Sequence, residues 1–394
     1  MFLMRPKMHF LQYLTLVPVV LTAPAPLHAS ADVDALIANQ YIVKFTDRSS
    51  LSGLSRTGLE EALSSFSAKA DRIYHGYFNG FAGNLNSSTL KLLREHPEVE
   101  YIEQDAIVTA AAFVSQPNAP WNLARISHRA RGPTAYVYDD SAGAGSCVYI
   151  LDTGITVTHP EFGGRAFWGA NFASSVNTDD NGHGTAVAGI IGSTTYGVAK
   201  RSTLVGVKVL SAAGSGTTSG IIAGLNFVAQ DVATRRCPSG AIINLSVGGS
   251  YSAALNSAVN SAVADGRLVA VAAGNSASNI ANFSPASAQS ACTVGSTTAS
   301  DAAVSSSNYG PLLDVWAPGQ NIQTTWLGGG TQTLSGSSLA AAHVAGLGAY
   351  LATLEGVNPG FLCTRIQQLA TPNILTGVPP GTVNLLVFNG NPTG

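Results

Sequence analysis

This 394-residue sequence carries unusually little charge. Only 11% of its residues are charged against 45% that are hydrophobic, which indicates a globular chain with a large buried core rather than a disordered one. The 20 basic and 22 acidic residues nearly cancel, so the balance selects neither a nucleic-acid backbone nor an anionic membrane as a partner. We therefore expect no nucleic-acid partner and no membrane partner for the folded protein.

Cysteine is also scarce, and what is missing around it excludes common metal sites. The sequence has no close Cys-x-x-Cys pair, which argues against a zinc cluster, and it has no His-Glu-x-x-His motif. In an oxidising compartment four cysteines can form two bridges with three possible pairings, and their spacing leaves the pairing open. The four residues are Cys147, Cys237, Cys292 and Cys363.

The first residues are typical of an exported protein. Residues 1–29 contain Arg5 and Lys7, then an apolar stretch from residue 10 to 21, then small residues ending at Ala29. That stretch is shorter than the roughly 20 residues that a membrane-spanning helix needs, and it contains Pro18. We therefore predict a signal peptide that is cleaved after Ala29, and a secreted, extracellular protein.

A segment of different character follows. Residues 40–45, 74–85 and 99–103 are strand-like, whereas 58–70 and 88–95 have helical spacing. The resulting β-α-β-β-α-β order indicates a small α+β domain of the ferredoxin-like type. Residues 109–119 have no periodicity and small side chains, which suits an exposed, cleavable linker.

The remainder forms one larger unit in which buried strands alternate with helices. Apolar runs occur at 147–151, 204–210, 241–245, 268–272, 291–295 and 313–316, and helical patterns at 184–191, 219–230, 252–265 and 338–354. Continuous apolar strands between helices predict an α/β fold with a doubly wound, mostly parallel sheet. In such a sheet the functional residues gather at the carboxyl ends of the strands.

Four polar residues stand at these strand ends and helix starts. Asp152 and Asn275 directly follow predicted strands, His183 lies between glycines at a helix start, and Ser338 begins a long helix of small residues. Together they supply a carboxylate, a base, a nucleophile and an oxyanion donor, the groups that acyl transfer requires.

Each of the four has a plainer interpretation when it is taken alone. Asp152 could be a turn residue or half of an aspartic-protease pair, although no second Asp-Thr-Gly is present. His183 could be a surface residue, Ser338 a helix cap and Asn275 a turn residue. An α/β-hydrolase would order its triad Ser, Asp, His, whereas the order here is Asp, His, Ser.

These motifs resemble the subtilisin-like serine protease family, in particular its proteinase K group, over nearly all of residues 38–394. The resemblance is carried by Asp152–Gly154, His183–Thr185, Leu245–Gly249, Ala273–Asn275, Ser335–Ser338 and Asn118–Ile126. It implies a signal peptide at 1–29, an inhibitor I9-type propeptide at 30–112 with its core at about 38–108, and a catalytic domain at 113–394. It also implies a broad-specificity endopeptidase that acts on proteins and peptides, with the propeptide as chaperone and inhibitor. We expect a monomer.

The resemblance further implies how the site is built. It pairs Cys147 with Cys237 and Cys292 with Cys363. It predicts that the substrate binds as an added strand between two backbone segments, and that a pocket without charged residues accepts large apolar or aromatic side chains. The segments are Gly214, Ser215, Gly216 and Ser246, Val247, Gly248, and the pocket is formed by Ala272, Ala273 and Gly274.

A structural calcium ion is the cofactor that the resemblance implies. Asp314 occupies the position of the family's carboxylate ligand, although Gln289 replaces a proline of that site.

The sequence departs from the family at Ala186, Leu339 and Ala342, where relatives have histidine, methionine and proline. Alanine at 342 is expected to relax the position of Ser338 and lower activity. The alternatives to a protease are an inert peptide-binding homologue and a secreted esterase.

Overall fold

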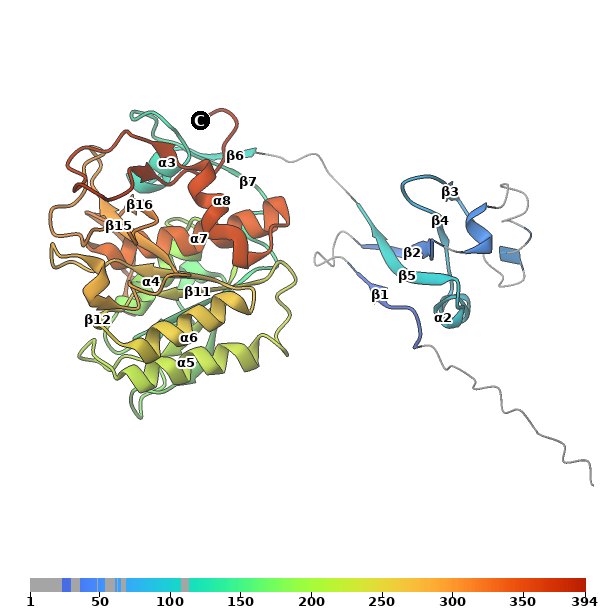
Figure 1. The fold of residues 1–394 in the computed structure, drawn as a ribbon, viewed down its shortest axis with the longest axis horizontal. Coiled ribbons are helices and arrows are strands. Elements are labelled where there is room, and N and C mark those ends of the chain that lie inside the picture. The colour runs from blue at the N-terminus through green and yellow to red at the C-terminus, as the bar shows by residue number, and fades with distance from the viewer. Residues whose placement is uncertain are drawn as a thin grey trace, which may run out of the picture. The chain divides into compact units, whose positions relative to one another are not determined.

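The chain forms two compact units, residues 1–108 and 109–394, which are described separately (Figure 1). The computed structural model describes residues 23–29, 36–47, 49–53, 61, 63, 64, 69–107 and 113–394. The predicted helix over 58–70 lies largely outside these residues. The division between the units falls at the start of the predicted linker.

The first unit is a small sheet with a helix. Its described strands have the order β1-β5-β2-β4-β3, with β2 paired antiparallel to both β4 and β5. The order β5-β2-β4-β3 is that of the predicted ferredoxin-like domain. The elements are β1 (Leu27–His28), β2 (Leu36–Phe45), β3 (Arg72–Tyr74), β4 (Gly80–Asn84), α2 (Ser87–Glu95) and β5 (Val99–Ala106).

Successive side chains of a strand point to opposite faces of the sheet, and this alternation explains which residues are buried. Val43 and Phe45 on β2, and Phe81 on β4, point into one core with Leu93 of α2. Asn86 caps α2, because its side-chain oxygen accepts the N–H of Thr89.

Residues near the N-terminus also pack on this unit. Leu27 and His28 pair in parallel with Ile102 and Glu103 of β5, and Ala25 is buried in the core. Part of the stretch predicted as the end of a signal peptide therefore forms an edge strand in the uncut chain.

The larger unit is built on a nine-stranded sheet in the order β19-β20-β16-β15-β13-β11-β8-β10-β9, parallel except for the β19–β20 pair. The predicted α/β fold with a mostly parallel sheet is confirmed. The strands are β8 (Cys147–Asp152), β9 (Ala166–Asn171), β10 (Thr203–Lys208), β11 (Ala241–Leu245), β13 (Leu268–Ala272), β15 (Cys292–Thr297), β16 (Val315–Pro318), β19 (Thr371–Pro372) and β20 (Leu385–Leu386).

Helices cover both faces of this sheet (Figure 1). Val148 and Ile150 of β8 pack in one core with α4 and α7, whereas Tyr149 and Leu151 pack in a second core with α5 and α6. Burial on both faces is why the strand sequences are continuously apolar. The helices are α3 (Trp121–Ile126), α4 (His183–Gly192), α5 (Thr218–Asp231), α6 (Ala253–Ala264), α7 (Ser337–Glu355) and α8 (Leu362–Leu369).

Short two-stranded sheets complete the unit. They pair β6 (Phe113–Gln116) with β7 (Tyr136–Asp139), β12 (Gly249–Ser250) with β14 (Phe283–Ser284), and β17 (Ile322–Thr325) with β18 (Thr331–Leu334). Helix α7 has the length and hydropathy of a membrane span, but it is the mostly buried core helix of this unit.

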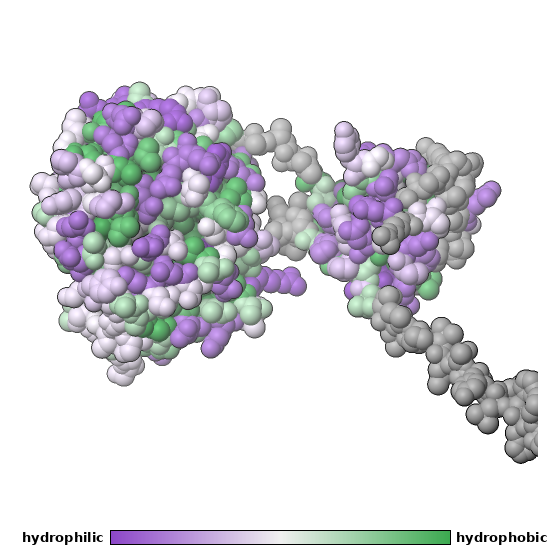
Figure 2. Space-filling view, in the orientation of Figure 1, coloured by the Kyte–Doolittle hydropathy of each residue, from purple (hydrophilic) through white to green (hydrophobic). Residues whose placement is uncertain are grey.

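The surface of the larger unit is mixed in polarity, and its four cysteines form two disulfides. On the face of the larger unit drawn in Figure 2, hydrophilic and hydrophobic residues are mixed. Disulfides join Cys147 to Cys237 and Cys292 to Cys363, which confirms the pairing that the family resemblance implied.

Candidate active site

Asp152 and His183 meet at the carboxyl end of β8. Asp152 is fully buried, and its Oδ1 lies 2.7 Å from His183 Nδ1. The same oxygen accepts the N–H of Thr153 at 2.7 Å. The negative charge of Asp152 raises the pKa of the His183 imidazole above its ordinary value, although burial of the ring opposes the shift. The ring keeps 29% of its side-chain surface exposed, so its other nitrogen can serve a substrate.

A glycine allows the segments that carry Asp152 and His183 to approach this closely. Any Cβ at Gly184 would collide with the carbonyl oxygen of Gly154, so helix α4 can begin beside the loop that follows Asp152 only with glycine at this position.

Two adjacent serines begin α7, and the structure separates their roles. Ser337 is fully buried, and its Oγ accepts the N–H of Gly274 at 3.0 Å. Ser338 is only half-buried; its hydroxyl donates to the carbonyl of Ser246 at 3.2 Å, and the Ser246 hydroxyl donates to the Ser338 carbonyl at 2.8 Å. Ser338 is therefore the serine that is accessible to a substrate.

Asn275 follows β13 and is oriented by α7. Its Oδ1 accepts the N–H of Ser337 at 2.9 Å, which turns the amide so that the two Nδ2 hydrogens remain as donors. A backbone N–H in the first turn of a helix, such as that of Ser338, has no intrahelical acceptor. Asn275 Nδ2 and the N–H of Ser338 are therefore candidates for the two donors that an oxyanion hole requires.

A cleft runs along these residues as two adjoining cavities of about 800 Å³ and 380 Å³, which share residues 246–250. His183 lines the larger cavity and Ser338 the smaller one. All nine residues predicted to bind substrate line them. Gly214, Ser215 and Gly216 line the larger cavity; Ala272, Ala273 and Gly274 line the smaller one; and Ser246, Val247 and Gly248 line both.

Three residues that sequence reasoning missed support the site. Asp179 is buried and accepts hydrogen bonds from the segments that carry Asp152 and His183. Lys208, fully buried at the end of β10, donates to the carbonyl of Thr153 and to Asp180. Asn308 holds the loop that carries Asn275, since its amide accepts from Ser276 and Ser278 and donates to Ala273. In the sequence, Asp179 lies four residues before His183 and Lys208 interrupts the apolar run 204–210, whereas Asn308 is far from every motif.

The Asp314 carboxylate stands at the opposite edge of the sheet, directly before β16. It accepts the N–H of Thr293 at 2.8 Å and the amide of Gln367 at 3.1 Å. Burial raises the pKa of Asp314 to about 6 despite these bonds. Within the described part of the chain no cationic side chain forms an ion pair with it.

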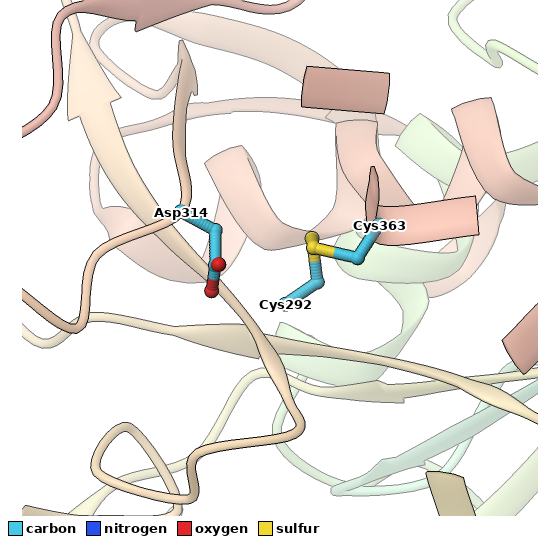
Figure 3. A group of neighbouring side chains, drawn as sticks. All are labelled: Cys292, Asp314 and Cys363. Carbon is cyan, nitrogen blue, oxygen red and sulfur yellow. A yellow bond between two sulfur atoms is a disulfide. The ribbon is translucent and has the colours of Figure 1, made fainter. Parts of the chain in front are cut away.

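Two cysteines lie beside Asp314, but they offer no thiolate. Figure 3 shows that Cys292 and Cys363 are bonded to each other in a disulfide. A zinc site of two thiolates and a carboxylate is therefore excluded for this group, whereas an oxygen donor without a cation fits a hard ion such as calcium.

The three departures from the family are all buried. Ala186 lies in α4, and Leu339 and Ala342 lie in the first turns of α7. Helix α7 runs without a break from Ser337 through Ala342.

Sequence models of two families match the chain. The subtilase family matches residues 143–370, and peptidase inhibitor I9 matches residues 40–111.

Known proteins match over almost the full length. The subtilisin-like serine protease AsES of Sarocladium strictum is 57% identical over 97% of this chain and 98% of its own. The cuticle-degrading protease of Metarhizium anisopliae is 50% identical over 97% of this chain and 100% of its own. Proteinase R of Parengyodontium album is 49% identical over 93% and 92%, respectively.

A solved structure is also similar. It is the crystal structure of a cold adapted subtilisin-like serine proteinase, which has a TM-score of 0.65 and 43% identity and covers 69% of this chain and 98% of its own.

Proposed function

This chain belongs to the subtilase family of serine endopeptidases, and we propose that Asp152, His183 and Ser338 are the residues that hydrolyse the peptide bond. The observation that carries the proposal is the 2.7 Å bond between the buried Asp152 and His183 on a cleft that the accessible Ser338 also lines. A base held by a buried carboxylate, with a serine hydroxyl lining the same cleft, fits the arrangement that activates serine.

The reaction is acyl transfer in two halves. Ser338 Oγ attacks the scissile carbonyl, and His183 Nε2 takes the hydroxyl proton. Asn275 Nδ2 and the Ser338 N–H bind the oxyanion. His183 then gives its proton to the leaving amine, and the peptide bond breaks. Water, deprotonated by the same imidazole, attacks the acyl-enzyme and releases the acid with the regenerated serine.

Substrate binds as an extended strand. Ser246–Gly248 borders both cavities, and Gly214–Gly216 borders the larger one, so a peptide laid along the cleft meets main-chain groups of both segments. Main-chain recognition is independent of side-chain identity, which supports broad specificity.

The smaller cavity supports a preference for large apolar residues before the cut. It is lined by Ala272, Ala273, Phe283 and Ala286, and none of the described residues that line it is ionisable. Burying an aromatic side chain there contributes about 1.5–3 kcal/mol. We expect kcat/KM for a peptide amide with Phe before the cut to exceed that for Lys or Glu by about 10- to 100-fold. The measurement is release of a chromogenic amine from substrates that differ at that residue only.

Matched ester and amide substrates of the same sequence separate the two alternatives. Cleavage of the ester alone would identify an esterase. Binding of both substrates without turnover would identify an inert peptide-binding homologue.

We propose three successive parts in the precursor: a signal peptide at 1–29, a propeptide at 30–112 and the catalytic domain at 113–394. The I9 and subtilase matches, and the division into units at residue 108, support the second boundary. A propeptide of the inhibitor I9 type is an intramolecular partner of the enzyme. Cleavage after Ala29 would remove β1 from the first unit.

Extracellular action is supported by the relative whose name describes cuticle degradation. Two disulfides agree with an oxidising compartment. The proposed triad is complete within one chain, so the site requires no second copy, and we propose a monomer.

We propose that Asp314 supplies the carboxylate of a structural calcium site. A half-buried carboxylate with no cationic partner among the described residues fits an oxygen-coordinated ion, which would neutralise the charge. Asp314 precedes β16, so the site lies at the amino edge of the parallel sheet, away from Asp152 and Asn275. The ion would stabilise the fold without entering the reaction.

Calcium is therefore expected to raise the Tm of the mature enzyme. Saturating a site that exists only in the folded state at 100 times its Kd contributes about 2.7 kcal/mol. The measurement is thermal unfolding of the enzyme, inhibited at its serine, with CaCl₂ or with a chelator. Asp314→Asn should abolish the difference, whereas Asp265→Asn, at an exposed carboxylate, should keep it. An equal Tm with calcium and chelator in the unsubstituted enzyme would contradict the proposal.

A further inference from the structure

Asp179 makes an unusually complete set of hydrogen bonds. The residue keeps only 5% of its surface exposed, and its carboxylate accepts five hydrogen bonds. Oδ1 accepts the Thr153 hydroxyl at 2.8 Å and the N–H groups of Asn181 and Gly182 at 3.1 and 2.8 Å. Oδ2 accepts the N–H and the hydroxyl of Thr185 at 2.9 and 2.6 Å.

These donors come from both catalytic segments. Thr153 directly follows Asp152, whereas Asn181, Gly182 and Thr185 surround His183. The Thr153 hydroxyl also accepts the N–H of Gly184 at 2.9 Å, which adds a second link between the segments. One carboxylate therefore fixes the loop after Asp152 against the start of α4, and with it the 2.7 Å distance between Asp152 and His183.

The negative charge of Asp179 is stabilised by hydrogen-bond donors rather than by a cation. The neighbouring Asp180 has its own cation, because Lys208 lies 2.6 Å from it. In the fully described residues 113–394 no Lys, Arg or His forms an ion pair with Asp179. The negative charge of Asp152 has the larger effect on the pKa of His183, and the charge of Asp179 raises that pKa further.

We infer that Asp179 is a positioning residue of the proposed reaction, one that sets the geometry of the Asp152–His183 pair. It touches neither the substrate nor the reacting atoms. The inference rests on the proposed function, since it assumes that His183 is the base. Hydrogen bonds to a charged acceptor are the strong kind, and misplacing a catalytic group by about 1 Å can cost 100-fold in rate.

Asp179→Asn tests the positioning role of Asp179 and the effect of its charge on His183. An asparagine side chain of the same shape keeps one acceptor oxygen and turns the other into an NH₂ donor facing donors, so the loops shift. We expect kcat to fall about 10- to 100-fold with KM little changed. The acid limb of the pH profile of kcat/KM should move to lower pH, because the removal of a nearby negative charge lowers the pKa of His183.

Two further variants make the result specific. Asp139→Asn changes another buried carboxylate that accepts a backbone N–H, at Ser141, outside the catalytic loops. It should lower Tm and leave kcat and the acid limb in place. Thr153→Val removes the two hydrogen bonds of the Thr153 hydroxyl, to Asp179 and from Gly184, but keeps the charge of Asp179, so it should lower kcat and leave the acid limb in place.

A folded Asp179→Asn enzyme with the kcat of the unsubstituted enzyme would overturn the inference, as would a lower kcat with an unmoved acid limb. If Asp179→Asn does not fold, unchanged kcat in Thr153→Val overturns it and a reduced kcat at unchanged Tm supports it. Activity that survives loss of Ser338 or His183 would instead refute the proposed function.

Discussion

Replacing Ser338 by alanine is expected to lower kcat by about 10⁶-fold, the size of the loss measured for the triad serine of subtilisin. The reason is chemical, because alanine has no atom that can attack a carbonyl. The fold should persist, since Ser338 is half-buried and its main bond to Ser246 is made through the backbone carbonyl. The measurement combines peptide turnover with intact mass and N-terminal sequencing of the protein recovered from the medium.

The neighbouring serine is the matched control for this experiment. Ser337→Ala removes the acceptor of the Gly274 N–H, which costs about 1–3 kcal/mol of stability, but it leaves the nucleophile in place. We expect Ser337→Ala to mature and to cleave peptides, and Ser338→Ala to retain its propeptide. If both variants mature at the same residue, a host protease makes the cut; if Ser338→Ala also cleaves peptide substrates, the assignment of the nucleophile is wrong.

Asp152→Asn is expected to lower kcat by about 10⁴-fold, the loss typical of triads whose carboxylate becomes an amide. Asn cannot fix the imidazole as the tautomer with its proton on Nδ1, so Nε2 is no longer a dependable base. The pH profile should change as well. His183 acts when neutral, and the charge of Asp152 raises its pKa, so removing that charge lowers the pKa and moves the acid limb to lower pH.

Traces of active enzyme would mask so small a residual rate. The measurement is therefore the first-order self-cleavage of the purified precursor at a series of pH values. The double variant Asp152→Asn with His183→Ala is the control, and it should lose the acid limb altogether. An acid limb at the same pH in Asp152→Asn and in the unsubstituted precursor would contradict the assigned role of Asp152.

Sequence reasoning was most successful where a motif coincides with the end of a buried strand. Asp152 and Asn275 follow uninterrupted apolar runs, and the structure places both at the carboxyl edge of the sheet. The alternation of apolar, strand-like stretches with helical patterns was sufficient to predict the fold. Strand β9 was missed because residues 166–171 form a half-exposed edge strand, interrupted by Gly169, that lacks a continuous apolar pattern.

Reasoning from sequence could not recover contacts between distant segments. Ser337 and Ser338 have the same chemistry and adjacent positions, and only the packing of α7 against the loop after β13 separates a buried acceptor from an accessible nucleophile. Asp179 and Asp180 are equally indistinguishable by sequence, yet one binds two loops and the other pairs with Lys208. Such roles depend on which donors the fold delivers to a carboxylate.

Both disulfides lie at the amino ends of the parallel strands, opposite the edge that carries the proposed active site. Cys147 and Cys292 are the first residues of β8 and β15, whereas Asp152 and the residues that line the cleft follow the other ends of the parallel strands. The domain is thus cross-linked at the amino ends of β8 and β15, whereas the loops that line the cleft are held by non-covalent contacts. The disulfides therefore restrain the amino ends of β8 and β15 and place no covalent restraint on the loops that line the cleft.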